Sequence, residues 1–225
     1  MKEYAPIDRL WSLGLPLFFI LGQIAIEIFV PLRLKPALHS EWGPHETLQA
    51  IFISIAFIVA ACSAVKIDWK EQKLLGIWFV LAAICCFYVA GEEISWGQQI
   101  LQWDTPEYWS TLNDQNETNL HNTSAWLDQK PRLVLFLGIA FGGLVIPALR
   151  RWKPNVLPAQ FSILYPPDAL IPTALGVIVP YLIQEIAEIW DFKVFHRVSE
   201  LQELYMYYFV LLYLMDLRNR VFNKV

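Results

Sequence analysis

The chain has 225 residues, of which 56% are hydrophobic and only 17% are charged, and its mean hydropathy is +0.40. A soluble domain usually carries about 25% charged residues, so this composition is that of a helical membrane protein and excludes an ordinary soluble domain. The net charge of −4 gives no basis for nucleic acid as a partner.

Six apolar segments are long enough to cross a bilayer, since a spanning helix needs roughly 17–25 residues. The stretch at about 154–168 is too short and too rich in proline to span, so we expect it along the membrane surface. The sequence therefore predicts an all-α fold, an integral membrane helical bundle that forms one domain over residues 1–225. Its transmembrane helices are expected at about 10–31, 47–66, 74–101, 132–150, 169–190 and 200–217.

Lys and Arg residues are distributed unevenly between the two sides of these predicted spans. Eleven of the 17 lie on the side that holds both termini, and six lie on the other side. Loops on the cytoplasmic side of a membrane carry the excess of Lys and Arg. We therefore expect both termini in the cytoplasm, the polar loop at about 102–131 facing outward, and a location in the plasma membrane among its lipids.

Acidic and histidine side chains recur near the outward ends of several predicted spans. Carboxylates held close together in a dry site cannot all ionise, so they share protons or bind a cation. Carboxylates and imidazoles from several helices are also the ligands of metal sites in helical bundles and the usual groups of acid–base catalysis. Seven carboxylates and two imidazoles are expected on this side: Glu27, Glu92, Glu93, Glu185, Glu188, Glu200, Glu203, His121 and His196.

This pattern favours a membrane-embedded enzyme, hydrolase-like, that acts on a lipid or lipid-linked substrate at the outer leaflet. The catalytic residues are expected to be Glu92, Glu93 and Glu203, with Glu92 or Glu203 as the proton-transfer group. The candidate cofactor is a divalent metal cation, with the expected ligands Glu93, His121, Glu185 and Glu188. Substrate or loop contacts are expected from Trp96, Gln99, Asn116, Asn119, Asn122, His196 and Glu200.

Two other classes of function stay open. One is a cation- or proton-coupled transporter or channel, although the predicted spans at about 47–66 and 132–150 carry almost no polar residues at mid-membrane. The other is a scaffold of an envelope complex that docks a membrane protein partner through the polar loop. Glutamates at helix starts, such as Glu200 and Glu203, are also stabilised by the helix dipole without any site. Glu93, at a carboxyl end, has no such stabilisation and is the stronger candidate.

The stretch GEEISWGQQILQWDTPE, followed by NDQNETNLHN, resembles a family of uncharacterised bacterial multi-pass membrane proteins. The resemblance centres on residues 91–122, implies a bacterial inner-membrane location and brings no reaction with it. The Glu92–Glu93 pair is also similar to the paired-glutamate motif of CAAX-type intramembrane proteases. That family has an arginine four residues after the second glutamate, where this chain has Gly97, and its later His-x-x-x-Asn or Asp motif is absent. Protease activity is therefore not carried over.

Overall fold

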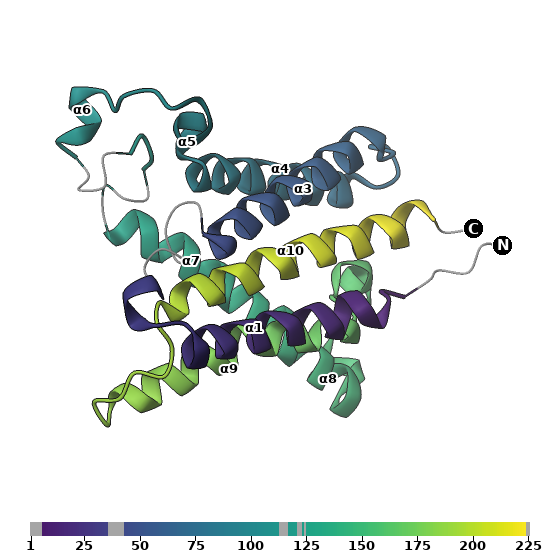
Figure 1. The fold of residues 1–225 in the computed structure, drawn as a ribbon. Coiled ribbons are helices and arrows are strands. Elements are labelled where there is room, and N and C mark those ends of the chain that lie inside the picture. The colour runs from purple at the N-terminus through teal and green to yellow at the C-terminus, as the bar shows by residue number, and fades with distance from the viewer. Residues whose placement is uncertain (1–5, 36–42, 113–116, 121–122, 124, 224–225) are drawn as a thin grey trace. The chain divides into compact units, whose positions relative to one another are not determined.

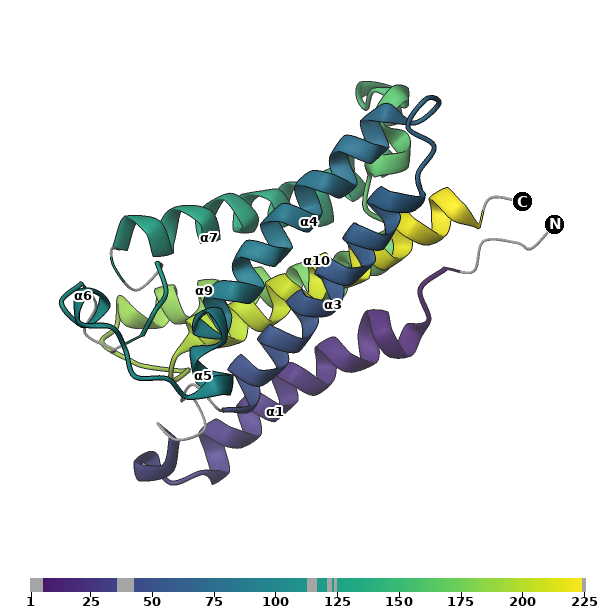
Figure 2. The same ribbon diagram turned by 90° about the horizontal axis from the view of Figure 1, so that it is seen from above.

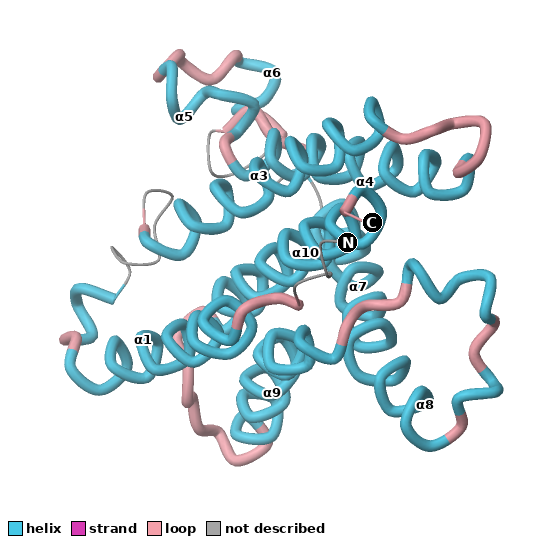
Figure 3. Tube along the Cα trace, turned by 90° about the vertical axis from the view of Figure 1, so that its right-hand side faces the viewer, coloured by secondary structure: helices cyan, strands magenta, loops and turns pink. Residues whose placement is uncertain are grey.

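A computed structural model of the chain describes residues 6–35, 43–112, 117–120, 123 and 125–223. These described residues are mostly helical and include no strand, as the colours of Figure 3 show. The predicted all-α fold is thereby confirmed. The sequence predicts a single transmembrane domain, and the contacts divide the chain into two compact units, one of residues 50–137 and the other of residues 1–49 with 138–225.

Five helical stretches are long and apolar enough to cross a membrane, judged by length and composition. They overlap the first five predicted segments and indicate a multi-pass membrane protein. Their bounds are Leu10–Phe29, Pro44–Lys66, Lys73–Glu93, Gln129–Trp152 and Asp168–Glu188.

The sixth predicted segment, at about 200–217, forms the helix α10 (Val198–Phe222), which does not belong to these five stretches. Its tyrosines and glutamates lower its hydropathy below that of the others. Fourteen of its 25 residues are buried, so α10 is an interior helix rather than one with a broad exposed face.

Helices α1 (Leu15–Phe29), α9 (Ile171–Glu188) and α10 lie side by side in the unit that contains both termini (Figures 1 and 2). The ring of Phe19 on α1 packs edge-on against Tyr205 and Tyr208 of α10, with centroids 5.7 and 5.4 Å apart. Burying one large apolar side chain contributes roughly 1.5–3 kcal/mol, so this aromatic cluster is a main contact between the two helices.

Two π-helical segments, η1 (Leu10–Gly14) and η5 (Phe141–Val145), come shortly before prolines. The prolines are Pro16 in α1 and Pro147 in α8 (Ile146–Trp152). Proline has no N–H to donate to the carbonyl four residues earlier, so the α-helical pattern is interrupted and a wider turn forms.

Tyrosine hydroxyls of α10 donate to carbonyl oxygens in this interrupted stretch near the start of α1. Tyr208 donates to the carbonyl of Trp11 at 2.6 Å, and Tyr205 donates to the carbonyl of Pro16 at 2.5 Å. A buried carbonyl without a partner is costly, so these bonds stabilise the break in the helix.

The chain between α8 and α9 forms three short 3₁₀ turns instead of a spanning helix, as expected for this proline-rich stretch: η6 (Pro154–Val156), η7 (Ala159–Leu164) and η8 (Asp168–Leu170). Its carbonyls accept hydrogen bonds from α10. Arg220 Nη1 donates to Ile163 at 2.5 Å, and the Tyr213 hydroxyl donates to Leu164 at 2.9 Å. The membrane-surface location of this stretch stays a prediction.

The unit of residues 50–137 is built on most of α3 (Pro44–Lys66), on α4 (Lys73–Glu93) and on most of α7 (Ala125–Ala140). Short turns join α3 to α4, and the rings of Phe57 and Phe87 lie 5.4 Å apart between them.

After α4 the chain continues through three short helical turns, η3 (Ser95–Gly97), α5 (Gln98–Leu101) and α6 (Glu107–Ser110). The third predicted span, at about 74–101, therefore ends as a regular helix at Glu93. The cause of this early end is the backbone at Ser95 and Trp96.

Candidate functional site: two polar clusters at helix ends

The helix α4 ends in a sharp reversal over the sequence Gly91 to Gly97. Ser95, Trp96 and Gly97 adopt φ values of 46°, 54° and 98°, a left-handed backbone that favours glycine and strains the other two residues. The Trp96 ring folds back onto Gly91, where an added Cβ would lie 2.8 Å from the ring. The GEEISWG motif therefore specifies a reversal that turns the indole back over its own helix.

Glu92 ties this reversal to the polar loop that follows. Its side chain is buried, and its Oε1 accepts a hydrogen bond from Trp96 Nε1 at 2.6 Å. Its Oε2 accepts the backbone N–H of Leu120 at 2.7 Å. Both carboxylate oxygens thus hold protein groups in place. Hydrogen bonds to an ionised acceptor are among the stronger ones in proteins, which suits an anchoring role.

The loop residues on either side of this anchor form a second layer of buried hydrogen bonds. Ser95 Oγ donates to Glu117 Oε2 at 3.0 Å, and Asn119 Nδ2 donates both to Ser95 Oγ at 3.2 Å and to Glu117. Thr118 N donates to Gln98 Oε1 at 2.7 Å. The two parts of the sequence that resemble the bacterial membrane-protein family, at 91–98 and 117–120, therefore belong to one hydrogen-bond network. This network rigidifies the loop.

A second cluster lies in the other unit, around the carboxylate of Glu27 near the end of α1. Gln23 Nε2 donates to Glu27 Oε1 at 2.8 Å, and Lys35, just after η2 (Leu32–Leu34), donates from Nζ to Oε2 at 2.6 Å. The Lys35 and Glu27 side chains are only 9% and 11% exposed, so they form a buried ion pair. A buried pair of this kind is stable only when further hydrogen bonds satisfy it.

His196 supplies those further bonds. Its backbone N–H donates to Glu27 Oε1 at 2.6 Å, and its Nδ1 lies 2.9 Å from Glu27 Oε2. Lys35 Nζ also lies 3.5 Å from Nδ1. An ionised carboxylate can only accept, so Nδ1 is the donor in its contact with Glu27, and an imidazole with its single proton on Nδ1 has its lone pair on Nε2. No hydrogen bond joins Nε2 to any described residue, and the side chain is 31% exposed. Nε2 is therefore the one atom of this cluster that is positioned to act as a base.

The backbone around His196 is held by a second side chain. Gln184 Oε1 accepts the N–H groups of Val194 and Phe195 at 3.1 and 2.8 Å, and its Nε2 donates to Glu188 Oε1 at 2.7 Å. Arg197, which follows His196, has a φ of 52° and starts α10 from a strained backbone. The imidazole is thus positioned by helices on both sides of its loop.

The predicted catalytic and metal-binding glutamates lie in different surroundings. Glu93 is half-buried at the end of α4 in the 50–137 unit. In the other unit, Glu185 and Glu188 are exposed on α9, whereas Glu203 is buried in α10. Among the described residues, no three His, Cys, Asp or Glu side chains gather to hold a metal ion. The metal site stays a prediction, because His121 lies outside the described residues.

The predicted contact residues also divide into groups. Trp96 and Asn119 take part in the Glu92 network, and Glu200 accepts a hydrogen bond from Gln49 at its backbone carbonyl. Gln99 belongs to α5, and its side chain is not described. Asn116 and Asn122 lie outside the described residues.

Several residues of the two clusters were not expected from the sequence, among them Gln23, Lys35, Glu117 and Gln184. Gln23 and Glu27 are spaced four residues apart within an apolar span, and this spacing was the available signal for a shared helix face. No spacing rule relates Glu27 to His196, because 169 residues separate them.

Comparisons with models of protein families, with curated proteins and with solved structures find no match to this chain.

Proposed function

We propose that the chain is a plasma-membrane enzyme that hydrolyses a lipid or lipid-linked substrate, with His196 as the general base. The observation that carries the proposal is the contact of 2.9 Å between His196 Nδ1 and the Glu27 carboxylate. A carboxylate in this position fixes the tautomer of an imidazole and stabilises the imidazolium that forms when Nε2 takes a proton. Lys35 balances the charge of Glu27 within the cluster.

In the reaction, His196 Nε2 removes a proton from water while the water oxygen attacks an acyl or phosphoryl centre. The same nitrogen then returns the proton to the leaving oxygen, so the enzyme ends each cycle unchanged. The proposal gives His196 the proton-transfer role that the sequence suggested for Glu92 or Glu203. Glu92 is less suited to that role, because both of its oxygens accept hydrogen bonds from the protein.

The cluster of Glu27 and His196 lies near helix ends, and this position supports an amphiphilic substrate. Glu27 lies two residues before the end of α1, and His196 lies two residues before the start of α10. The ends of spanning helices lie near the headgroup region, where the ester and phosphate linkages of lipids are found. The Lys and Arg distribution assigns this side to the outer leaflet and both termini to the cytoplasm.

Hydrolysis can be tested without knowing the substrate, because water supplies one oxygen of the products. Membranes that contain the protein are incubated in ¹⁸O-water, and lipid and water-soluble extracts are searched by mass spectrometry for newly labelled species. His196→Asn keeps a donor near the position of Nδ1 and removes Nε2. We expect it to lower the initial labelling rate by about 10²–10⁴-fold, the usual contribution of a general base.

Lys193→Gln is the matched control, because Lys193 is exposed in the same loop. It should label at the rate of the unchanged protein. Melting temperatures in detergent establish that all three proteins are folded. The proposal is wrong if no labelled species depends on the protein, or if His196→Asn labels at the full rate.

The orientation has its own test, single-cysteine labelling in a background without Cys62, Cys85 and Cys86. An impermeant thiol reagent added to intact cells should label Thr111→Cys, which lies in the loop expected outside, and should not label Lys70→Cys until the cells are lysed. The reverse pattern would assign the His196 cluster to the cytoplasmic face.

A further inference from the structure

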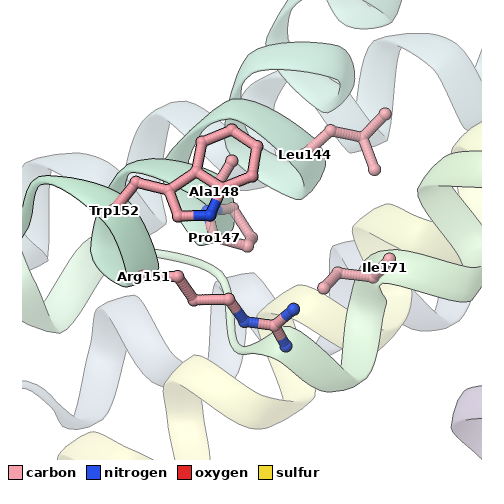
Figure 4. Close-up of a pocket in the computed structure, with 6 residues that line it drawn as sticks. All are labelled: Leu144, Pro147, Ala148, Arg151, Trp152 and Ile171. Carbon is pink, nitrogen blue, oxygen red and sulfur yellow. The ribbon is translucent and has the colours of Figure 1, made fainter.

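A small pocket lies at the end of the fourth apolar stretch, away from the residues of the His196 cluster. It has a volume of about 190 Å³ and is lined by Leu144, Pro147, Ala148, Arg151, Trp152 and Ile171 (Figure 4). The first five belong to η5 and α8, at spacings of three or four residues that place them on one helix face. Ile171 is the first residue of α9.

The helix face that lines this pocket is long enough to lie along part of a lipid chain. The helix face from residue 144 to residue 152 is about 12 Å long at roughly 1.5 Å per residue. One leaflet of a bilayer has about 15 Å of hydrocarbon, half of the ~30 Å core. Leu144, Pro147, Ala148 and Ile171 supply apolar walls along this length.

The rim of the pocket carries positive charge. Arg150 donates to Asp168 Oδ1 at 2.5 Å, whereas Arg151 reaches the same carboxylate at the longer distance of 3.3 Å. One aspartate thus faces two arginines, and a net positive charge remains. The Arg151 side chain is 65% exposed and extends from α8 toward Ile171 across the pocket (Figure 4). A phosphate group would complete the charge balance at this rim.

The position of the pocket at the membrane boundary adds a third observation. It lies where the stretch Gln129–Trp152 ends and the stretch Asp168–Glu188 begins. Trp152 is 81% exposed beside the pocket, and tryptophan is enriched at the level of lipid headgroups. The apolar walls of the pocket match the acyl chain of a phospholipid, and the cation and the indole at its rim match the headgroup.

We infer that this pocket binds one anionic phospholipid, with an acyl chain along the η5–α8 face and the phosphate at Arg151. Phosphatidylglycerol is the probe, because it carries a single net negative charge. The full chain is taken from vesicles that contain equal amounts of phosphatidylglycerol and phosphatidylcholine, and the lipids that it retains are counted by native mass spectrometry. The unchanged protein should retain phosphatidylglycerol in preference to phosphatidylcholine.

Two substitutions address the two halves of the site. Arg151→Gln should weaken the affinity for phosphatidylglycerol about fivefold, the effect of one cation near a lipid surface, and should leave phosphatidylcholine retention unchanged. Ala148→Leu fills the pocket without changing any charge and should remove the preferentially bound lipid. Lys70→Gln is the control for net charge, since Lys70 is exposed in the 50–137 unit, and it should behave as the unchanged protein.

Melting temperatures show which variants fold, and Ala148→Met replaces Ala148→Leu if the larger side chain prevents folding. Equal retention of the two lipids by the unchanged protein would overturn the inference. So would a loss of preference in Arg151→Gln with none in the pocket-filling variant, because charge alone would then explain the binding. Raising the melting temperature with inorganic phosphate as effectively as with phosphatidylglycerol would indicate a free anion and would also overturn it.

Discussion

Arg220→Met is expected to lower the free energy of unfolding by about 3–5 kcal/mol, the usual effect of removing one partner from a buried ion pair. The Asp216 side chain is only 1% exposed, and Arg220 Nε donates to it at 2.7 Å. The same guanidinium donates to the carbonyl of Ile163. The substitution therefore takes a cation from a buried carboxylate and removes one of the hydrogen bonds that hold the 3₁₀ turns between α8 and α9.

The double variant Asp216→Leu with Arg220→Met tests whether the unpaired charge of Asp216 causes the loss of stability. It removes the carboxylate together with its cation, and replacing a buried ion pair by apolar side chains is often close to neutral. We expect its unfolding free energy to lie much nearer that of the unchanged protein than that of Arg220→Met. Chemical unfolding in detergent measures all three. If the single and double variants lost the same stability, the Asp216 charge would not be the cause.

Glu92→Gln is expected to cost about 1–3 kcal/mol, because one of the two donors that bind the buried Glu92 carboxylate loses its acceptor. Trp96 Nε1 and the backbone N–H of Leu120 bind different oxygens of Glu92, and the amide replaces one of these oxygens by an NH2 group that cannot accept. We also expect the 117–120 segment to be cleaved faster by protease, since its link to α4 is weakened. This result would identify Glu92 as a structural residue of the loop.

Glu71→Gln makes the same chemical change at an exposed position in the same unit and should alter stability by less than about 0.5 kcal/mol. Melting in detergent and limited proteolysis are compared for the two variants. Unchanged melting and unchanged cleavage in Glu92→Gln would show that its hydrogen bonds contribute little. The carboxylate would then be a stronger candidate for the catalytic role that the sequence suggested.

The apolar spans could be predicted well, because length and hydropathy depend on local composition. The segments expected at about 47–66 and 169–190 match α3 and α9 to within a few residues. The third span was predicted too long, because apolar residues continue beyond Glu93. What ends the helix is the left-handed backbone at Ser95 and Trp96, which composition does not reveal.

The candidate sites were harder to predict. The residues at 91–98 and 117–120, which carry the resemblance to the bacterial family, were recognised as unusual from the sequence. In the structure they belong to the hydrogen-bond network around Glu92. Their role could not be read from residue type, because a glutamate that anchors a loop and one that transfers protons look the same in a sequence. The Glu27–His196 pair depends on contacts over 169 residues, which a single sequence does not specify.

The order of the hydrogen-bonding partners along the chain has a consequence for membrane insertion. Glu27 precedes His196 by 169 residues, so the end of α1 that carries Glu27 is synthesised long before its histidine partner. A lone carboxylate in an apolar helix opposes entry into the bilayer. Lys35 follows only eight residues after Glu27 and provides a cation almost at once. We therefore expect the ion pair with Lys35 to form first and to shield this end of the helix before His196 is synthesised.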